Sequence, residues 1–144
     1  MSSSIVIAAA DTTNVKPTSI TPAWILAGKP ENRAKQLALS KDRNSYTMVW
    51  DCTAGSFDWH YNLDETLVVL EGEAYISFDG AAERRIGPSD VVFFPGGCSA
   101  TWRVPNYIRK VAFLRHPIPP PGGFCVRAWN ALLRVVLRRQ GGGL

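Results

Sequence analysis

Short runs of apolar residues, each bounded by turn-forming residues, fill most of the chain. Candidate strands occur at 34–40, 46–52, 57–61, 66–70, 73–78, 83–86, 90–94, 100–104 and 108–114, and most of them contain β-branched or aromatic residues. The segment 34–40 contains neither, and its Ala, Lys, Gln and Leu also allow a brief helix. Gly, Pro, Asp and Asn separate the candidate strands, and these residues favour turns. Many short strands with frequent turns predict an all-β sandwich or barrel. The space between the facing sheets is then the expected place for a ligand.

A different period begins near the end of the chain. The segment 117–123 is rich in Pro and Gly, which predicts a stiff linker. Beyond it almost every residue is apolar except for polar residues that recur every three or four positions, namely Arg127, Asn130, Arg134 and Arg138. This spacing predicts an amphipathic helix over 124–140, which the following glycines would end.

The part ahead of the strands shows neither period. Residues 1–22 are rich in Ser, Thr and Ala, and Pro17 and Pro22 interrupt them. We expect an N-terminal arm, which is either mobile or added to a sheet as an edge strand. Residues 23–116 then form the barrel, and at 144 residues the chain is long enough for one domain with its own core.

Charge and composition narrow the choice of partners. The formal charge of +4 lies in the tail, because the rest of the chain carries twelve basic and twelve acidic residues. A neutral body gives no electrostatic footprint for nucleic acid, so we expect no such partner. No apolar run has the length of a membrane span or the flanks of a signal peptide, so we expect a cytoplasmic protein. Three cysteines, an odd number, predict reduced thiols.

The chemically richest stretch stands directly before one of the apolar runs. Four ionisable residues, Asp58, His60, Asp64 and Glu65, precede the run 66–70, which Gly72 closes. A strand that starts on carboxylates and an imidazole and then turns apolar predicts a barrel wall with a polar patch that faces inward. About twenty residues later, 87–97 gives a turn, an apolar strand and another turn in order.

These two stretches resemble the two motifs of the cupin superfamily. The spacing from Glu65 to Gly72 is that of the glutamate and glycine in the first motif, and Gly87–Gly97 is similar to the second. Trp50–Phe57 and Thr101–Val104 narrow the resemblance to small single-domain cupins related to ureidoglycine aminohydrolases and ethanolamine-utilisation cupins. The resemblance implies an RmlC-like jelly roll, a double-stranded β-helix, with the C-terminal amphipathic helix as an addition.

Metal-binding cupins, by this resemblance, use two histidines in a His-x-His pattern, a glutamate three or four residues on, and a histidine from the second motif. If four residues separate the pair from Glu65, the pair is Asp58 and His60. If three residues separate them, the pair is Trp59 and Tyr61. The second motif would place its histidine near position 100, where this chain has Ala100, which cannot bind a metal. Asp58, His60 and Glu65 are therefore the candidate ligands for one divalent Mn, Fe or Zn ion. The simpler interpretation of His60 is a hydrogen-bonded polar residue of the barrel.

The same groups suggest chemistry without a metal. His60 is a candidate general base, and a buried Glu65 with a raised pKa is a candidate acid. Asp58, Tyr61 and Trp102 are candidate ligand-binding residues of the cavity. The leading hypothesis is a small-molecule-binding cupin, catalytic if this cluster acts as an acid and a base. The alternatives are a metal-dependent enzyme of the aminohydrolase or isomerase type and a catalytically silent assembly barrel.

The predicted tail helix needs a cover for its wide apolar face. A homodimer is the favoured explanation, because a second subunit covers such a face readily and because many cupins, by the resemblance, pair through their sheets. The alternative is contact with an anionic membrane surface, which suits an amphipathic helix with an arginine stripe.

Overall fold

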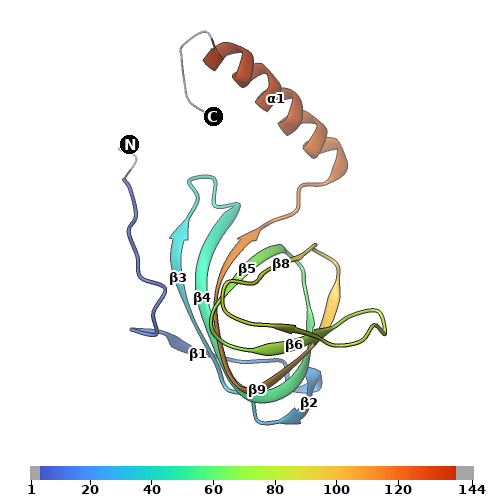
Figure 1. Ribbon diagram of the computed structural model, residues 1–144. Helices are drawn as coiled ribbons and strands as arrows, with labels where there is room; N and C mark the ends of the chain where they lie inside the picture. Colours follow the sequence, from blue (N-terminus) through green and yellow to red (C-terminus); the bar gives the residue numbers. More distant parts are fainter. Residues whose placement is uncertain (1–3, 139–144) are drawn as a thin grey trace.

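The computed structural model describes residues 4–138, in which an antiparallel β-barrel is followed by one long helix (Figure 1). In chain order the elements are β1 (Lys16–Thr18), the 3-10 helix η1 (Pro22–Trp24), β2 (Ile25–Gly28), β3 (Asn32–Leu39), β4 (Ser45–His60), β5 (Asp64–Gly72), β6 (Ala74–Ser77), β7 (Arg84–Ile86), β8 (Val91–Phe94), β9 (Ser99–Arg115) and α1 (Pro120–Arg138).

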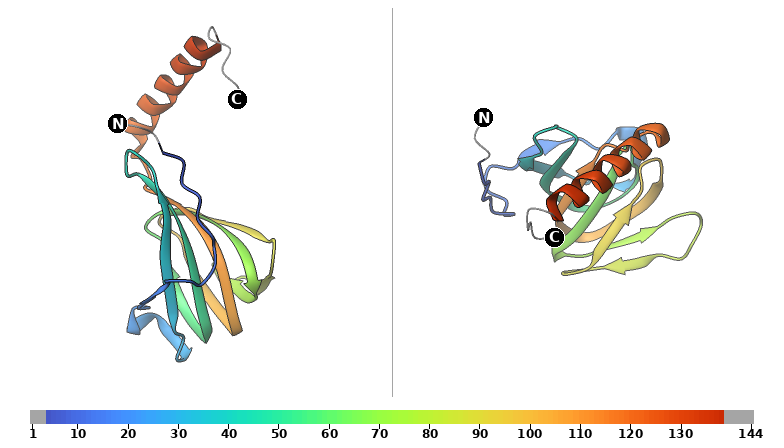
Figure 2. Two further views of the ribbon diagram at one scale, coloured as in Figure 1. Left: turned by 90° about the vertical axis from the view of Figure 1, so that its left-hand side faces the viewer. Right: turned by 90° about the horizontal axis from the view of Figure 1, so that it is seen from above.

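The two longest strands, β4 and β9, pair with each other along nearly their whole length and bend across the barrel. Their parts next to the helix lie in a sheet with the order β1-β3-β4-β9-β5-β8. Their other parts pair with β2 and β6, and β6 pairs in turn with β7. Figure 2 shows how these strands wrap around a common interior. The architecture is a jelly roll with an added helix, which confirms the predicted fold class.

Both long strands differ from the sequence prediction, which divided each of them in two. Thr53 of β4 pairs with Tyr107, but Gly55 pairs with Val104, so the register shifts between these positions. Pro105 falls in this irregularity, where an irregular position tolerates a residue without an N–H. The turn signals of Gly and Pro therefore mark the bends of two continuous strands instead of their ends.

Alternation along the strands explains why the barrel encloses a core. In β5, Glu65, Leu67 and Val69 are buried, while Thr66 and Val68 between them are partly exposed. Full burial of a Leu or Val side chain contributes about 1.5–3 kcal/mol. Aromatic rings fill the interior in ordered pairs: Phe57 is stacked on Trp102 with 6.3 Å between ring centroids, and Tyr61 on Phe94 with 4.2 Å.

The N-terminal arm predicted over 1–22 contributes the edge strand β1, which pairs with β3. The segment before β1 is tied to the outer face of the sheet. Lys35 of β3 donates hydrogen bonds to the carboxylate of Asp11 (3.1 Å) and the carbonyl of Thr13 (2.6 Å), and Arg109 of β9 donates to the carbonyl of Ala10. These bonds explain why the arm lies along the barrel although it lacks an apolar period.

The helix α1 begins at Pro120 instead of Phe124, so the second half of the predicted linker 117–123 is helical. Pro suits the first turn of a helix because its fixed φ matches and its missing N–H would have no partner there. Gly123 donates to the carbonyl of Pro119 (2.9 Å) within this turn. The predicted end at 140 lies outside the described residues.

Within residues 4–138, no helix is both long enough and apolar enough to cross a membrane.

Candidate functional site: the barrel cavity

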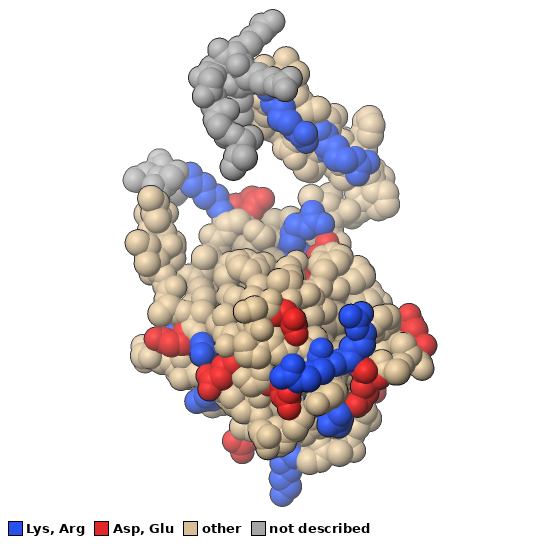
Figure 3. All heavy atoms as spheres, in the orientation of Figure 1, with Lys and Arg blue, Asp and Glu red and all other residues tan. Residues whose placement is uncertain are grey.

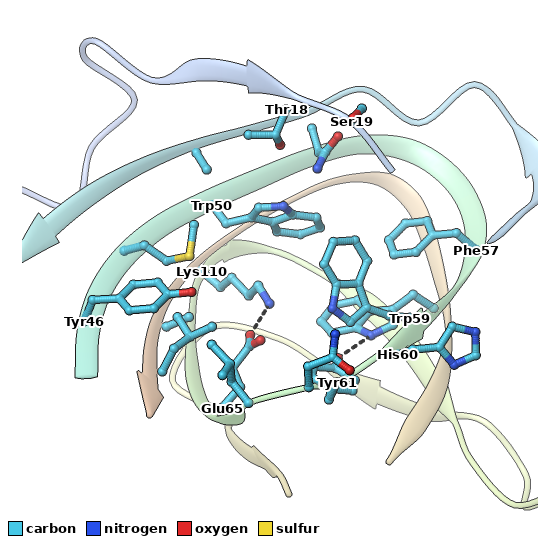
Figure 4. A pocket seen from close by; sticks show the side chains of 18 residues that line it. Thr18, Ser19, Tyr46, Trp50, Phe57, Trp59, His60, Tyr61, Glu65 and Lys110 are labelled. Atoms are coloured by element: carbon cyan, nitrogen blue, oxygen red, sulfur yellow. Dashed lines mark hydrogen bonds and ion pairs between the residues drawn. The ribbon is translucent and has the colours of Figure 1, made fainter. Parts of the chain in front are cut away.

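The barrel encloses a cavity of about 330 Å³ (Figure 4). Its floor is made of buried aromatic and ionisable side chains, mainly Trp50, Phe57, Tyr61, Glu65, Trp102 and Lys110. Exposed residues, Thr18, Ser19, His60 and Asn62, line its rim. A cavity with a buried floor and an exposed rim is accessible from solvent. Its volume lies at the small end of the range of about 300–1,000 Å³ that is usual for ligand sites.

The register of β4 decides which side chains of the motif face this cavity. Phe57 is buried in the core, and side chains two residues apart point to the same face of a strand. Trp59 and Tyr61 therefore face inward with Phe57 and line the cavity. Of the two pairs that the sequence left open, Trp59 and Tyr61 form the wall.

Asp58 does not line the cavity. Its carboxylate accepts a hydrogen bond from the hydroxyl of Thr101 (2.6 Å), which is its cross-strand neighbour on β9. His60 lies at the exposed rim, and its Nδ1 is 2.6 Å from the hydroxyl of Ser99, again the cross-strand neighbour. The imidazole also makes an edge contact with Trp24, with 4.8 Å between ring centroids. Figure 4 shows the ring of His60 pointing away from the floor of the cavity.

Glu65 is buried on the cavity floor, as the sequence led us to expect, and it has a partner that we did not foresee. The ammonium group of Lys110 lies 2.5 Å from Glu65 Oε1, and both side chains are less than a tenth exposed. The same ammonium group faces the rings of Trp50 and Trp102, at 4.8 and 5.1 Å from their centroids. A buried cation is thus held by one carboxylate and two indole faces, which is a favourable setting for it.

Tyr61 and Trp102 meet beside this ion pair. The indole Nε1 of Trp102 donates a hydrogen bond to the phenol oxygen of Tyr61 (3.0 Å). Burial, and secondarily the negative charge of Glu65, raises the pKa of Tyr61 well above its usual range. The same two causes raise the pKa of Tyr46. Both phenols are neutral at physiological pH and can donate a hydrogen bond to a molecule in the cavity.

The metal centre implied by the cupin resemblance is not assembled in this structure. The strand geometry does not bring Asp58, His60 and Glu65 together, and the part of the chain from residue 4 to 138 contains no group of three His, Cys, Asp or Glu side chains that could hold a metal ion. Glu65 is the one carboxylate among the residues that line the cavity, and the Lys110 ammonium beside it repels a divalent cation. The residues present do not fit such a metal.

Lys110 is the functional candidate that sequence reasoning missed. Lysines within predicted strands usually point outward, with the charged end in water. The signal was its position: in the run 108–114, Lys110 lies two residues from Ile108 and from Ala112, so it shares the strand face of these two buried residues. A lysine in phase with the apolar residues of a strand indicates a buried cation, and a buried cation needs a partner.

Nine antiparallel strands in the described part of the chain, which wrap around a cavity of ligand size, define a barrel of the cupin class. A family model described as the EutQ-like cupin domain matches residues 39–112, about half of the chain. The chain therefore belongs to the family of EutQ-like cupins.

Solved structures show the same fold in three other proteins. The ethanolamine utilization protein Q (EutQ) of Salmonella typhimurium LT2 is 24% identical, with a TM-score of 0.53 over 60% of this chain and 70% of that one. A protein of unknown function from Pseudomonas syringae pv. tomato DC3000 is 21% identical, with a TM-score of 0.65 over 72% of this chain, which spans only 45% of that protein. The polyketide cyclase RemF of Streptomyces resistomycificus is 17% identical, with a TM-score of 0.56 over 79% and 82% of the two chains.

At these identities the likeness shows the fold alone. Among curated protein sequences, no significant match to the chain is found.

Proposed function

We propose that the barrel binds a small molecule with a flat apolar body and one polar head, and that Lys110 and Glu65 hold the head. The observation that carries this proposal is the buried Lys110–Glu65 ion pair on the floor of an aromatic cavity. The hydrogen bonds of the described residues give the ammonium group one oxygen partner, Glu65, although it carries three N–H donors. A ligand acceptor can use the others.

The energetics of the pair support a binding role. Removing two charges from water costs several kcal/mol per ion, and well-packed apolar residues are often as stable or more stable in the same place. The pair is thus poorly explained by stability alone. In a cavity it supplies a donor and an acceptor side by side, and polar groups of this kind orient a ligand within apolar walls.

The walls and the pair together define the class of ligand. The indoles of Trp50, Trp59 and Trp102 favour a planar ring, because aromatic rings stack or meet edge to face. Lys110 offers hydrogen bonds to a carboxylate or carbonyl oxygen, and Glu65 accepts one from an N–H or O–H. An aromatic or heteroaromatic acid or amide satisfies both. His60 and Asn62 at the rim are polar enough to contact a part of the ligand that extends into solvent.

Three probes with the same ring test this proposal. Benzoate offers an anionic acceptor, benzamide offers an acceptor and a donor, and toluene offers neither. Titration followed by tryptophan fluorescence and by thermal unfolding is expected to give saturable binding of benzoate or benzamide at concentrations where toluene has no effect. Equal responses to all three would leave a merely apolar cavity and would contradict a role for the ion pair.

The matching variant removes the pair as a unit. Lys110→Met/Glu65→Gln leaves no unpaired buried charge, so the barrel is expected to fold while binding of benzoate weakens at least about tenfold. Arg85→Met/Glu73→Gln makes the same changes in an exposed ion pair of the barrel and serves as the control. Unchanged affinity in the first variant would show that the pair does not contact the ligand.

Proton transfer is a second candidate for the same pair, favoured by the direct hydrogen bond between Lys110 and Glu65. Glu65 would accept a proton from the carbon next to a ligand carbonyl, and Lys110 would stabilise the charge that develops on the carbonyl oxygen. Exchange of the methyl protons of acetophenone in D₂O measures this step without a known substrate. Glu65→Gln is expected to abolish any exchange above the background, and exchange that survives in this variant would exclude Glu65 as the base.

A further inference from the structure

The helix α1 stands away from the barrel and has no cover within the described residues. Figures 1 and 2 show it extending beyond the end of β9, joined to the barrel by a short connection. Large apolar side chains on it are exposed: Phe124 is 67%, Trp129 61% and Val135 60% exposed. Helices in proteins owe most of their stability to the packing of an apolar face. A helix with its apolar face bare therefore implies a cover outside the described chain.

The helix separates its charges from its apolar residues. Arg127 and Arg134 are seven residues apart, close to two full turns, and lie on the same face with Asn130 between them. The remaining circumference carries Trp129, Leu132 and other apolar residues. Figure 3 shows the basic side chains as one stripe along the helix. On the barrel, in contrast, basic and acidic side chains are interspersed.

Charge distinguishes an anionic lipid surface from the pairing of two α1 helices as the cover. All twelve acidic residues of the chain lie at or before Asp90, so the segment 116–144 holds four arginines and no acid. Its charge equals the whole net charge of +4. The same helix in a second copy would bring four more arginines and no carboxylate, so helix pairing would create no ion pair. An anionic lipid surface offers phosphates to the arginines and a hydrocarbon boundary to the apolar face.

We propose that α1 is a membrane-surface anchor that lies in the headgroup region of an anionic bilayer, with Trp129 and Leu132 toward the acyl chains and Arg127 and Arg134 on lipid phosphates. Trp is well suited to this depth, where one part of the ring is in an apolar layer and its N–H in a wet one. The barrel is then held beside the membrane by the connection between β9 and α1.

A second exposed apolar segment lies at the same end of the molecule. Ile5 and Ile7 of the N-terminal arm are 91% and 94% exposed, and Figures 1 and 2 place this part of the arm on the side of the barrel from which α1 extends. Exposed contiguous apolar surface on a protein marks an interaction site. In the proposed orientation both segments reach the same lipid surface, so the arm adds apolar area to that of the helix.

Flotation of the full chain with lipid vesicles tests the anchor. The chain is expected to float with vesicles of phosphatidylcholine and phosphatidylserine in about a 2:1 ratio and to stay at the bottom with phosphatidylcholine alone. Arg127→Gln/Arg134→Gln is expected to lower the partition coefficient about thirtyfold. The control Lys29→Gln/Arg84→Gln removes the same charge from exposed positions on the barrel, away from the end that carries α1, and is expected to leave the partition coefficient within about twofold.

A second variant probes the apolar face. Trp129→Ser/Leu132→Ser is expected to abolish flotation with either vesicle, and near-UV circular dichroism of the barrel tryptophans is expected to be unchanged because α1 does not pack on the barrel. Failure of the full chain to float with anionic vesicles overturns the proposal. A stable dimer in solution that Trp129→Ser/Leu132→Ser dissociates also overturns it, because a second copy would then be the cover.

Discussion

The barrel cavity and the helix α1 use similar residues under opposite conditions. Both combine tryptophan with a basic side chain, but Trp102 is 2% exposed and Trp129 is 61% exposed. In the barrel the buried cation Lys110 has Glu65 as its partner, whereas the helix carries arginines in a segment without acids. The barrel buries its own apolar core, and we propose that its cavity receives a small molecule. The apolar face of α1 is exposed within the described residues, and we propose a lipid surface as its cover.

The largest difference between the two regions is expected in the reactivity of their cysteines. Cys52 is buried in the barrel, and burial, followed by the charge of Asp51, raises its pKa to about 12. Cys125 on α1 is exposed. Because only the thiolate reacts, iodoacetamide at neutral pH is expected to alkylate Cys125 at least about a thousandfold faster than Cys52 in the native protein. Peptide mass spectrometry over time measures both rates, and comparable rates would mean that the barrel opens readily.

The buried ion pair on the cavity floor is expected to contribute more to stability than an exposed pair of the same barrel. Lys110→Met leaves the carboxylate of Glu65 buried without its cation, so the free energy of unfolding is expected to fall by about 3–5 kcal/mol. Arg85→Met breaks an exposed pair and is expected to cost at most about 1 kcal/mol. Urea unfolding measures both. A loss below about 1 kcal/mol for Lys110→Met would show that the cavity floor is hydrated and that the pair behaves like a surface pair.

Trp102 in the barrel and Trp129 on α1 allow the same substitution to be compared in both regions. Trp102→Ala removes a buried ring that stacks on Phe57 and binds Tyr61, so we expect a loss of about 3–4 kcal/mol. Trp129→Ala removes an exposed ring, and without lipid the change is expected to stay within about 0.5 kcal/mol. Equal losses in urea unfolding would mean that α1 is packed against a partner surface in solution and does not stand bare.

The smallest effect is expected at the surface of the barrel, at Asp64. The backbone N–H of Gly96 and the guanidinium of Arg115 lower the pKa of this carboxyl. A lowered folded-state pKa stabilises the fold above the unfolded pKa, near 3.8, and this contribution is lost as the pH falls through the folded-state pKa. Asp64→Asn is thus expected to cost about 1 kcal/mol at pH 7 and close to nothing in strong acid. A cost independent of pH would show that charge is not involved.

Much of the fold was predictable because strands leave a strong local signal. Short apolar runs separated by turn residues predicted the all-β class and most strands of the barrel. The continuity of β4 and β9 was not predictable, because Gly55 and Pro105 have the same local preference at a bend as at a turn. Only the pairing between distant strands distinguishes these two outcomes.

The site was predictable only in part, since a shift of one residue reverses the faces of a strand. Glu65 lies in the cavity, and Tyr61 and Trp102 line it, where ligand contact stays a prediction. Asp58 and His60 occupy the other phase of β4, and the aromatic residues in phase with Phe57 were the signal against them. The homodimer and the cytoplasmic location stay predictions.

Ligand binding at the ion pair can be observed at the side chain of Lys110 itself. In protein with ¹³C-labelled lysine, the Cε signal that disappears in Lys110→Met/Glu65→Gln belongs to Lys110. We expect this signal to shift and saturate during titration with benzoate while the signals of the surface lysines stay in place. A Lys110 signal that does not move at any benzoate concentration, or that moves no more than those of the surface lysines, would contradict binding at the ion pair.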